Sequence, residues 1–189
     1  MPREREAAAL RWHCACSRRS HLLSQFWGRR RPAAGVDLTK VVFSVEKADG
    51  REHAHETMWA EPVGKGRFRL RSVPFHVCGA SRGDTVLARE TAEGRRVEEI
   101  LERGGHSTYR ILVTDTEALQ RFWEYWKPLA DRGCTFERAE ARLFAVDVPP
   151  EADLQEVRAL LARGEEARVW ELEEAHVGHG SRVATGGRG

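Results

Sequence analysis

The stretch Gly104-Gly105-His106-Ser107-Thr108-Tyr109-Arg110-Ile111-Leu112-Val113 decides the fold of this chain. It joins a part that is rich in strand patterns to a part in which helical and strand patterns alternate. A glycine pair is a turn signal, and the apolar residues after it predict that the turn leads directly into a strand. His106, Ser107 and Thr108 therefore stand where a turn enters a sheet, and this makes the stretch the first candidate site.

The part before this stretch carries short alternating patterns of apolar and polar residues. The predicted strands lie at 41–46, 56–61, 67–71, 73–77, 85–89 and 95–102. Pro74 lies within one of them, which places that strand at an edge or a bulge because proline cannot donate to a ladder. Short strands at intervals of roughly 8 to 12 residues, separated by turn signals, predict a small antiparallel β-barrel or rolled sheet.

The part after this stretch changes its period. Thr114-Asp115-Thr116-Glu117 has the spacing of a capping box and begins an aromatic helix, which Pro128 should end early or kink. Strands are predicted at 134–138, 141–148 and 168–175, and a second helix begins near Leu154 and stops at Gly164. The resulting order of elements is typical of the split βαβ, ferredoxin-like sandwich, in which two helices cover one face of a four-stranded sheet. We therefore predict an α+β protein.

The predicted organisation has four segments. Residues 36–105 form the β-rich, barrel-like part, residues 106–177 form the ferredoxin-like part, and residues 178–189 form a disordered tail. Residues 1–35 hold eight Arg against two Glu and show no sustained period, so we expect a disordered Arg-rich arm. The preferred interpretation is an extension without function, because Val36 fits a GTG start codon; the alternative is a basic arm that contacts nucleic acid or acidic lipid.

The composition narrows the classes of function. With 189 residues, 41% of them hydrophobic and 32% charged, the chain can bury a core. It lacks a run of about 18 apolar residues and the apolar segment of a signal peptide, so we expect a cytoplasmic protein without a membrane partner. The net charge is +2, and the arm alone carries +6. The body is therefore left with −4, which makes nucleic acid an unlikely partner.

Two classes of function fit the central stretch. The first interpretation is a non-enzymatic binding or regulatory module for a protein partner or a small ligand. Its default site is a groove between the two parts. The predicted ligand-binding residues of this groove are Trp59, Phe75, Gly105, His106 and Arg110, with Ser107 and Thr108 beside them.

The alternative is a small enzyme of hydrolase or transferase type. His106 would act as acid or base, and Ser107 or Thr108 would orient the substrate. Neighbouring residues on a strand point to opposite faces, so a base for Ser107 would have to come from elsewhere, with His55 and His76 as candidates. A purely structural interpretation also remains, in which these side chains satisfy backbone groups at a junction.

Other chemistries have weaker support in the sequence. His53 and His55 are suitably spaced for a metal pair, but no third ligand is evident, so we expect neither a metal nor a cofactor. A second alternative is RNA binding through the ferredoxin-like sheet. It would use aromatic residues of the strands, namely Tyr109, Phe136, Phe144 and Trp170. No basic aromatic strand motif accompanies them.

Several segments of the sequence together carry a resemblance to a known family. They are Lys40-Val41-Val42-Phe43, Glu56-Thr57-Met58-Trp59-Ala60-Glu61-Pro62, Val73-Pro74-Phe75, Gly83-Asp84, Gly105-His106-Ser107-Thr108, Gly133-Cys134-Thr135, Val146-Asp147-Val148-Pro149-Pro150 and Trp170-Glu171. With these segments, residues 36 to about 177 resemble an uncharacterised bacterial family, domain of unknown function 4265. The resemblance implies a cytoplasmic bacterial protein and places residues 1–35 outside the family domain. It implies no activity.

Overall fold

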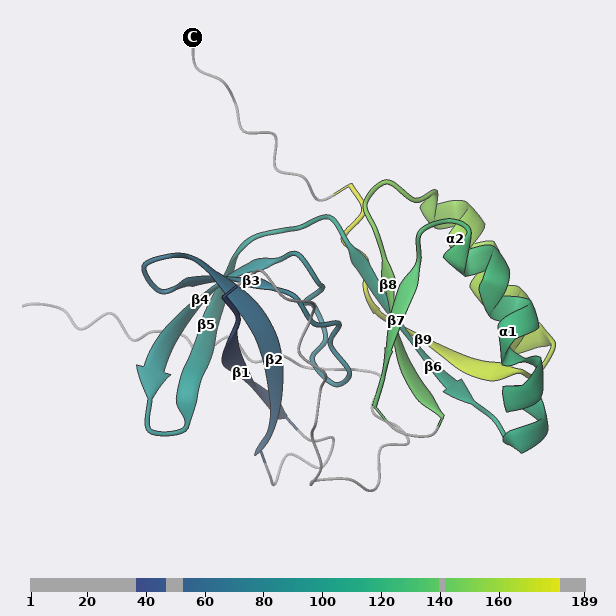
Figure 1. Cartoon of the computed structure of the whole chain (residues 1–189), viewed down its shortest axis with the longest axis horizontal. Coiled ribbons are helices and arrows are strands. Elements are labelled where there is room, and N and C mark those ends of the chain that lie inside the picture. The colour runs from purple at the N-terminus through teal and green to yellow at the C-terminus, as the bar shows by residue number, and fades with distance from the viewer. Residues whose placement is uncertain (1–36, 47–52, 140–141, 181–189) are drawn as a thin grey trace, which may run out of the picture.

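The computed structural model describes residues 37–46, 53–139 and 142–180. The predicted arm and most of the predicted tail lie outside these residues. In the described part, the strands fall into two sheets that the linker 103–106 connects (Figure 1). Neither described helix has the length and hydropathy that crossing a membrane requires.

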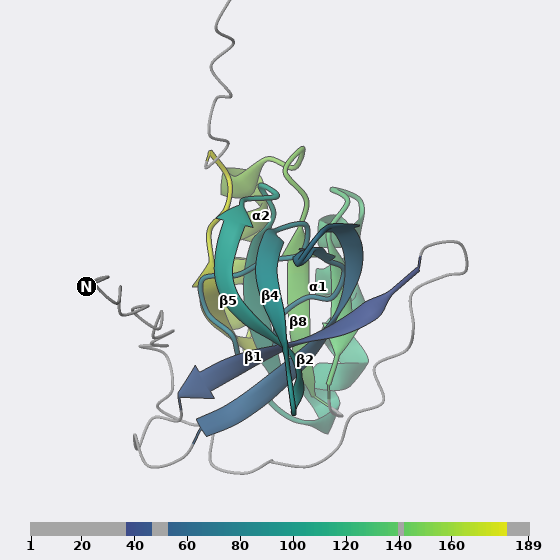
Figure 2. The ribbon, with the colours of Figure 1, turned by 90° about the vertical axis from the view of Figure 1, so that its left-hand side faces the viewer.

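The first sheet contains five strands, β1 (Thr39–Glu46), β2 (His53–Gly64), β3 (Arg67–Leu70), β4 (Thr85–Thr91) and β5 (Gly94–Glu102). Consecutive strands pair antiparallel, and β1 also pairs parallel with β5 through Val41↔Arg95 and Val42↔Arg96, so the pairing closes on itself. Figure 2 shows the face of the molecule on which β1 and β2 lie. Alternate residues such as Val41, Phe43 and Met58 point inward and form its core, as a period of two requires.

The second sheet contains β6 (Ser107–Val113), β7 (Thr135–Arg138), β8 (Leu143–Val148) and β9 (Trp170–His176) in the order β7-β8-β6-β9. All neighbours are antiparallel. Helices α1 (Thr116–Ala130) and α2 (Leu154–Glu166) lie together on one face (Figure 1). Mostly antiparallel sheets with two described helices make the protein α+β, as the sequence predicts.

Helix α1 differs from the prediction at both ends, since the capping-box spacing places the N-cap at Thr114 and the structure places it at Asp115. Its N-cap is Asp115, whose side chain accepts a hydrogen bond from the Ala118 N–H at 2.8 Å. The prediction that Pro128 ends the helix early is wrong, because α1 continues to Ala130. Proline removes the backbone hydrogen bond to the carbonyl four residues earlier, and that residue, Glu124, is exposed, so water can take the place of the missing donor.

Residues 71–84, which we name the covering loop, lie between β3 and β4 and reach the second sheet. The prediction of a strand at 73–77 is wrong. Its alternation instead reflects burial against two cores, since Val73 and Phe75 pack with Ala145 of β8 and Val77 packs inside the first sheet. The backbone N–H groups of the loop bind side-chain carboxylates in place of a neighbouring strand, and this removes the need for a ladder.

Candidate functional site at the junction of the two sheets

The two sheets meet where the linker 103–106 passes between the covering loop and the end of β9. We name this region the junction; it comprises residues 79–84, 103–108, 147–149 and 176–179. Asp84, whose side chain is buried, holds it together. Its carboxylate accepts hydrogen bonds from the Gly104 N–H at 2.8 Å, the Ser81 N–H at 3.1 Å and the Arg103 Nη1 at 3.0 Å. The loop and the linker are therefore fixed to each other.

Glycine is required at the junction because backbones approach closely there. A Cβ at Gly104 would lie 2.4 Å from the Gly83 carbonyl carbon, and one at Gly178 would lie 2.1 Å from the His106 carbonyl oxygen. No side chain fits at either position. Gly104 and Gly178 thus allow three chain segments that are far apart in the sequence to pack closely together.

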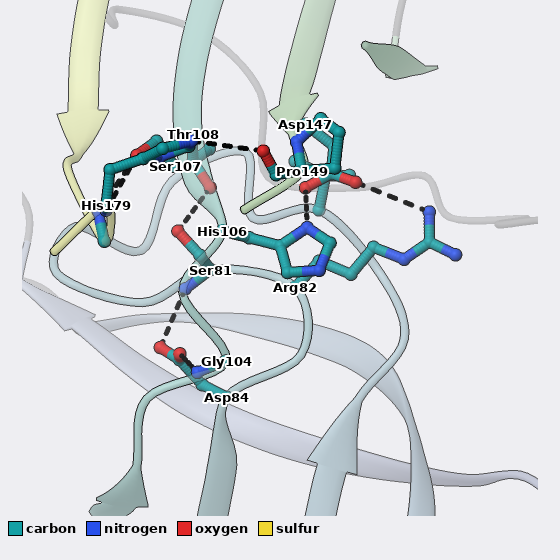
Figure 3. Close-up of polar contacts among 12 residues, drawn as sticks. Ser81, Arg82, Asp84, Gly104, His106, Ser107, Thr108, Asp147, Pro149 and His179 are labelled. Atoms are coloured by element: carbon teal, nitrogen blue, oxygen red, sulfur yellow. Dashed lines mark hydrogen bonds and ion pairs between the residues drawn. The ribbon is translucent and has the colours of Figure 1, made fainter. Parts of the chain in front are cut away.

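Ser107 is fully buried at the start of β6 and is bound on two sides. Its Oγ accepts a hydrogen bond from the Gly178 N–H at 2.9 Å and lies 2.7 Å from Nδ1 of His179. His179 Nε2 lies 3.1 Å from the Pro149 carbonyl oxygen, which can only accept, so Nε2 carries the proton. The Ser107 hydroxyl then donates to Nδ1 (Figure 3). The sequence prediction placed the disordered tail from residue 178, whereas Gly178 and His179 belong to this ordered contact.

Thr108 is fully buried too, and its Oγ1 lies 2.7 Å from Oγ of Ser81 on the covering loop. As expected for neighbours on a strand, Ser107 and Thr108 contact different segments. Both hydroxyl groups are used within the protein. The prediction that they orient a substrate stays a prediction, and this geometry favours the structural interpretation for both.

His106 differs from its neighbours because part of its ring remains accessible. Its Nδ1 lies 2.8 Å from Oδ1 of Asp147, a buried residue of β8, while the His106 side chain is 21% exposed. The other carboxylate oxygen of Asp147 lies 3.6 Å from Nη1 of Arg82 (Figure 3). Among the described residues, no hydrogen bond reaches His106 Nε2. The carboxylate accepts a hydrogen bond from Nδ1–H. Nε2 is then an acceptor in the neutral imidazole and a donor in the imidazolium.

Arg110 lies on β6, the strand that follows His106, and it has another role. Its guanidinium is buried, with Nη1 donating to Glu173 Oε1 at 2.6 Å and Nη2 donating to the Val77 carbonyl oxygen at 2.8 Å. It therefore ties the sheet to the covering loop. The structure does not bring this predicted ligand charge to the side of the junction where His106 is accessible.

Trp59 and Phe75 also support the covering loop. The Trp59 N–H donates to Ser72 Oγ at 3.2 Å, and Lys40 Nζ lies 5.2 Å from the centroid of its ring. Phe75 is buried against Ala145. Of the five predicted ligand-binding residues, only Gly105 and His106 lie together at the junction, and Gly105 is buried with a φ of 81° beside Pro150.

The covering loop also bears on the RNA-binding alternative. The aromatic residues that the sequence offered for stacking lie on the helix side of the second sheet, in its core. The opposite face carries Arg110 and Thr108, and both bind the covering loop. Stacking of bases on this sheet would require the loop to leave, so RNA binding stays a prediction that the geometry does not favour.

Arg82, Asp147 and His179 are site residues that the sequence did not predict. Arg82 precedes a Gly-Asp pair, and a charged residue beside such a turn can reach a neighbouring sheet. Asp147 carried a signal, since it interrupts an apolar strand, and a buried carboxylate needs partners. His179 had no signal, because it follows the last predicted strand.

Two titratable groups near the junction have shifted pKa values. Burial, followed by the charge of Arg103, lowers the pKa of His176, whose Nε2 lies 3.5 Å from Arg103 Nη1. Burial, followed by the charge of Asp147, raises the pKa of the Cys134 thiol to about 12, so it is not a reactive thiolate. The described part of the chain contains no cluster of three or more side chains suited to a metal ion.

Comparison with known proteins adds a family and a fold. A family model described as "Domain of unknown function (DUF4265)" matches residues 56–172, which confirms the resemblance found in the sequence. A solved structure described as "Novel crystal structure of a hypothetical protein from Neisseria gonorrhoeae" is similar, with a TM-score of 0.62 and 16% identity over 76% of this chain and 97% of that one. At this identity the likeness concerns the fold alone. No curated protein matches the chain.

Proposed function

Since the chain belongs to the family of domain of unknown function 4265, whose description names no activity, we propose a function from the geometry of the junction. The protein is a binding module for a small ligand, and His106 is the side chain that contacts the ligand. One observation carries this proposal. Among the polar side chains of the central stretch, Ser107 and Thr108 are buried and bound within the protein, whereas His106 keeps an accessible ring edge.

The surroundings of His106 support binding because they hold the ring in place. Asp147 is buried and accepts from Nδ1, so the orientation of the ring is set before any ligand arrives. The linker that carries His106 is itself fixed by the Asp84–Gly104 hydrogen bond on one side and by the Ser107–His179 contact on the other. A fixed contact group loses little conformational entropy on binding, and this favours affinity.

We further propose the finer fold classes that the sequence predicts. The closed pairing of β1 to β5 supports a small β-barrel. In the second part, the element order β6-α1-β7-β8-α2-β9 and the strand order β7-β8-β6-β9 support the ferredoxin-like sandwich. Both folds host many functions, so neither adds to the argument for a ligand.

A thermal-shift screen of the full chain against metabolites and nucleotides tests the binding proposal. A ligand at about a hundred times its dissociation constant stabilises a protein by about 2.7 kcal/mol, which raises the Tm by several degrees. The informative variant is His106→Asn, because an Asn amide can still donate to Asp147 while the Nε2 edge is removed. His55→Asn, at an exposed histidine of β2, is the matched control.

We expect a stabilising ligand whose effect is lost in His106→Asn and kept in His55→Asn. A ligand whose effect survives in His106→Asn would place binding elsewhere and contradict the proposal. No stabilisation across the whole panel would also count against a small ligand. It would leave a protein partner as the remaining form of the binding interpretation, to be sought by capture from a lysate.

The His106–Asp147 pair favours a second candidate function, an enzyme that uses His106 as a general base. A carboxylate that fixes the tautomer of a histidine, with Nε2 directed toward a substrate, is a common arrangement in acid–base catalysis. Ser107 does not fit the nucleophile of such an enzyme, since its Oγ accepts the Gly178 N–H in a buried position. The attacking group would therefore be water or a substrate hydroxyl.

Activity measurements separate this candidate from simple binding. The full chain would be assayed on ester and phosphoester substrates. An activity that falls roughly a hundredfold or more in His106→Asn, and also falls in Asp147→Asn, would support a catalytic base. Binding that depends on His106 with no turnover of the bound compound would exclude this candidate and leave the binding module.

A further inference from the structure

We propose that the ligand of the junction is a small oxyanion, a carboxylate or a phosphate group, held jointly by the Arg82 guanidinium and the Nε2 edge of His106. This inference rests on the proposed binding function and names its ligand class. It begins from the shared carboxylate of Asp147, which lies 2.8 Å from His106 Nδ1 and 3.6 Å from Arg82 Nη1. The two side chains are thereby held on either side of one buried acid (Figure 3).

Arg82 has donors that its ion pair does not use. The distance of 3.6 Å to Asp147 exceeds that of a hydrogen bond, and no hydrogen bond to the guanidinium occurs within the described residues. The side chain is 39% exposed, so its N–H groups can reach a ligand from solvent. An arginine fork matches the two oxygens of a carboxylate or phosphate, and this defines the ligand class.

The space beside His106 Nε2 is kept by a glycine. A Cβ placed at Gly83 would lie 3.0 Å from Cδ2 and 3.4 Å from Nε2 of His106. Any larger residue at position 83 would therefore crowd this edge of the ring. Gly83 follows Arg82 directly, so the turn of the covering loop that carries the guanidinium also lies beside this edge of the His106 ring.

The charges at the junction favour an anion over a cation. Asp147 supplies the nearest carboxylate, and His106 and Arg82 already face its two oxygens. Asp84 is turned to Gly104, Ser81 and Arg103. A cationic ligand would thus compete with Arg82 for the carboxylate of Asp147 and with Arg103 for that of Asp84. An anion instead meets the guanidinium and, when the imidazole is protonated, an Nε2–H donor.

The test uses the full chain, labelled with ¹⁵N, and two probes, inorganic phosphate and malonate. Sodium chloride at matched ionic strength controls for screening. The resonances of the His106 imidazole and the Gly83 amide report binding. The variants are Arg82→Gln and Arg82→Lys, and the matched control is Arg163→Gln at an exposed arginine of α2.

We expect saturable shifts at His106 with at least one probe, and an affinity that falls about tenfold or more in Arg82→Gln. Arg82→Lys should restore only part of it, because an ammonium lacks the fork. Arg163→Gln should bind like the wild type. Preference for phosphate or for malonate identifies the source of the oxyanion and supports the inference in either case.

The oxyanion proposal would be contradicted by resonance shifts no larger than those in sodium chloride. It would also be contradicted by an equal loss of affinity in Arg82→Gln and Arg163→Gln. The failure of this inference is distinguishable from failure of the binding function. One distinguishing result is a neutral or cationic ligand that binds the wild type and Arg82→Gln but not His106→Asn. That result would contradict the oxyanion proposal and still support the binding module. If no ligand depends on His106 for binding, both the oxyanion proposal and the binding function are contradicted.

Discussion

Glu56 illustrates how one buried side chain can fix an irregular segment. It lies on β2 with 5% of its surface exposed. Its carboxylate accepts hydrogen bonds from three consecutive backbone N–H groups of the covering loop, those of Phe75, His76 and Val77, at 2.8 to 2.9 Å. A charged acceptor satisfies these donors in place of a neighbouring strand. Residues 75–77 of the loop therefore depend on the charge and shape of Glu56.

Glu56→Gln should destabilise the protein by about 2 to 4 kcal/mol. The amide keeps one acceptor oxygen, but its NH₂ group meets a backbone donor, and buried donors are left without a partner. Urea unfolding measures the loss. Glu98→Gln is the control, because Glu98 forms a surface ion pair with Arg89 and should change stability by about 1 kcal/mol or less. Equal effects of the two substitutions would show that Glu56 does not hold the loop.

Helix α2 shows why a helix breaker can lie inside an element. The prediction that Gly164 stops this helix is wrong, because α2 continues to Glu166. Gly164 is buried against the indole of Trp170 on β9, and a Cβ there would lie 2.1 Å from Cζ2 of that ring. The indole Nε1 donates to the Leu161 carbonyl oxygen at 3.0 Å, which holds the ring against the helix. The glycine thus serves the contact between helix and sheet.

Gly164→Ala separates helix propensity from packing, since the two predict opposite signs. Propensity alone would stabilise α2 by about 1 kcal/mol. The clash with Trp170 predicts a loss of about 1 to 3 kcal/mol from overpacking. The free energy of unfolding decides between them, with Ala159→Gly at an exposed position of α2 as the measure of propensity in this helix. A gain in stability for Gly164→Ala would contradict the packing argument.

At the scale of the whole molecule, the end of β9 closes the junction between the sheets. Arg103 of the linker donates to the Gly79 carbonyl oxygen at 2.5 Å and to Asp84, and it also lies against His176. The Gly79 N–H donates to the Ala175 carbonyl oxygen at 3.3 Å. The covering loop, the linker and β9 thus form one contact, and His176 lies within it.

Lowering the pH should reduce the free energy of unfolding through the protonation of His176. Burial, and then Arg103, lower its pKa in the folded state, so as the pH falls the unfolded chain takes up the proton first. The stability present above the ordinary histidine pKa of about 6.5 is lost as the pH falls through the lower folded value. Unfolding in urea between pH 8 and pH 4.5 should show this slope in the wild type and a smaller one in His176→Gln. His55→Gln, as control, should keep the wild-type slope; an unchanged slope in His176→Gln would exclude His176 as its source.

The sequence by itself determined most of the elements and their order, because a period of two or of 3.6 residues records which side of a strand or helix is buried; the strand predicted at 73–77 is the exception. It also located the central stretch and a family resemblance over residues 36 to about 177, and the family model matches residues 56–172. Only the tertiary structure decided the site. His106 meets Asp147 across 41 residues, and Ser107 meets His179 across 72. Local patterns cannot encode such pairs, since the packing of the covering loop and β9 around the linker sets which side chains are buried and which one remains accessible.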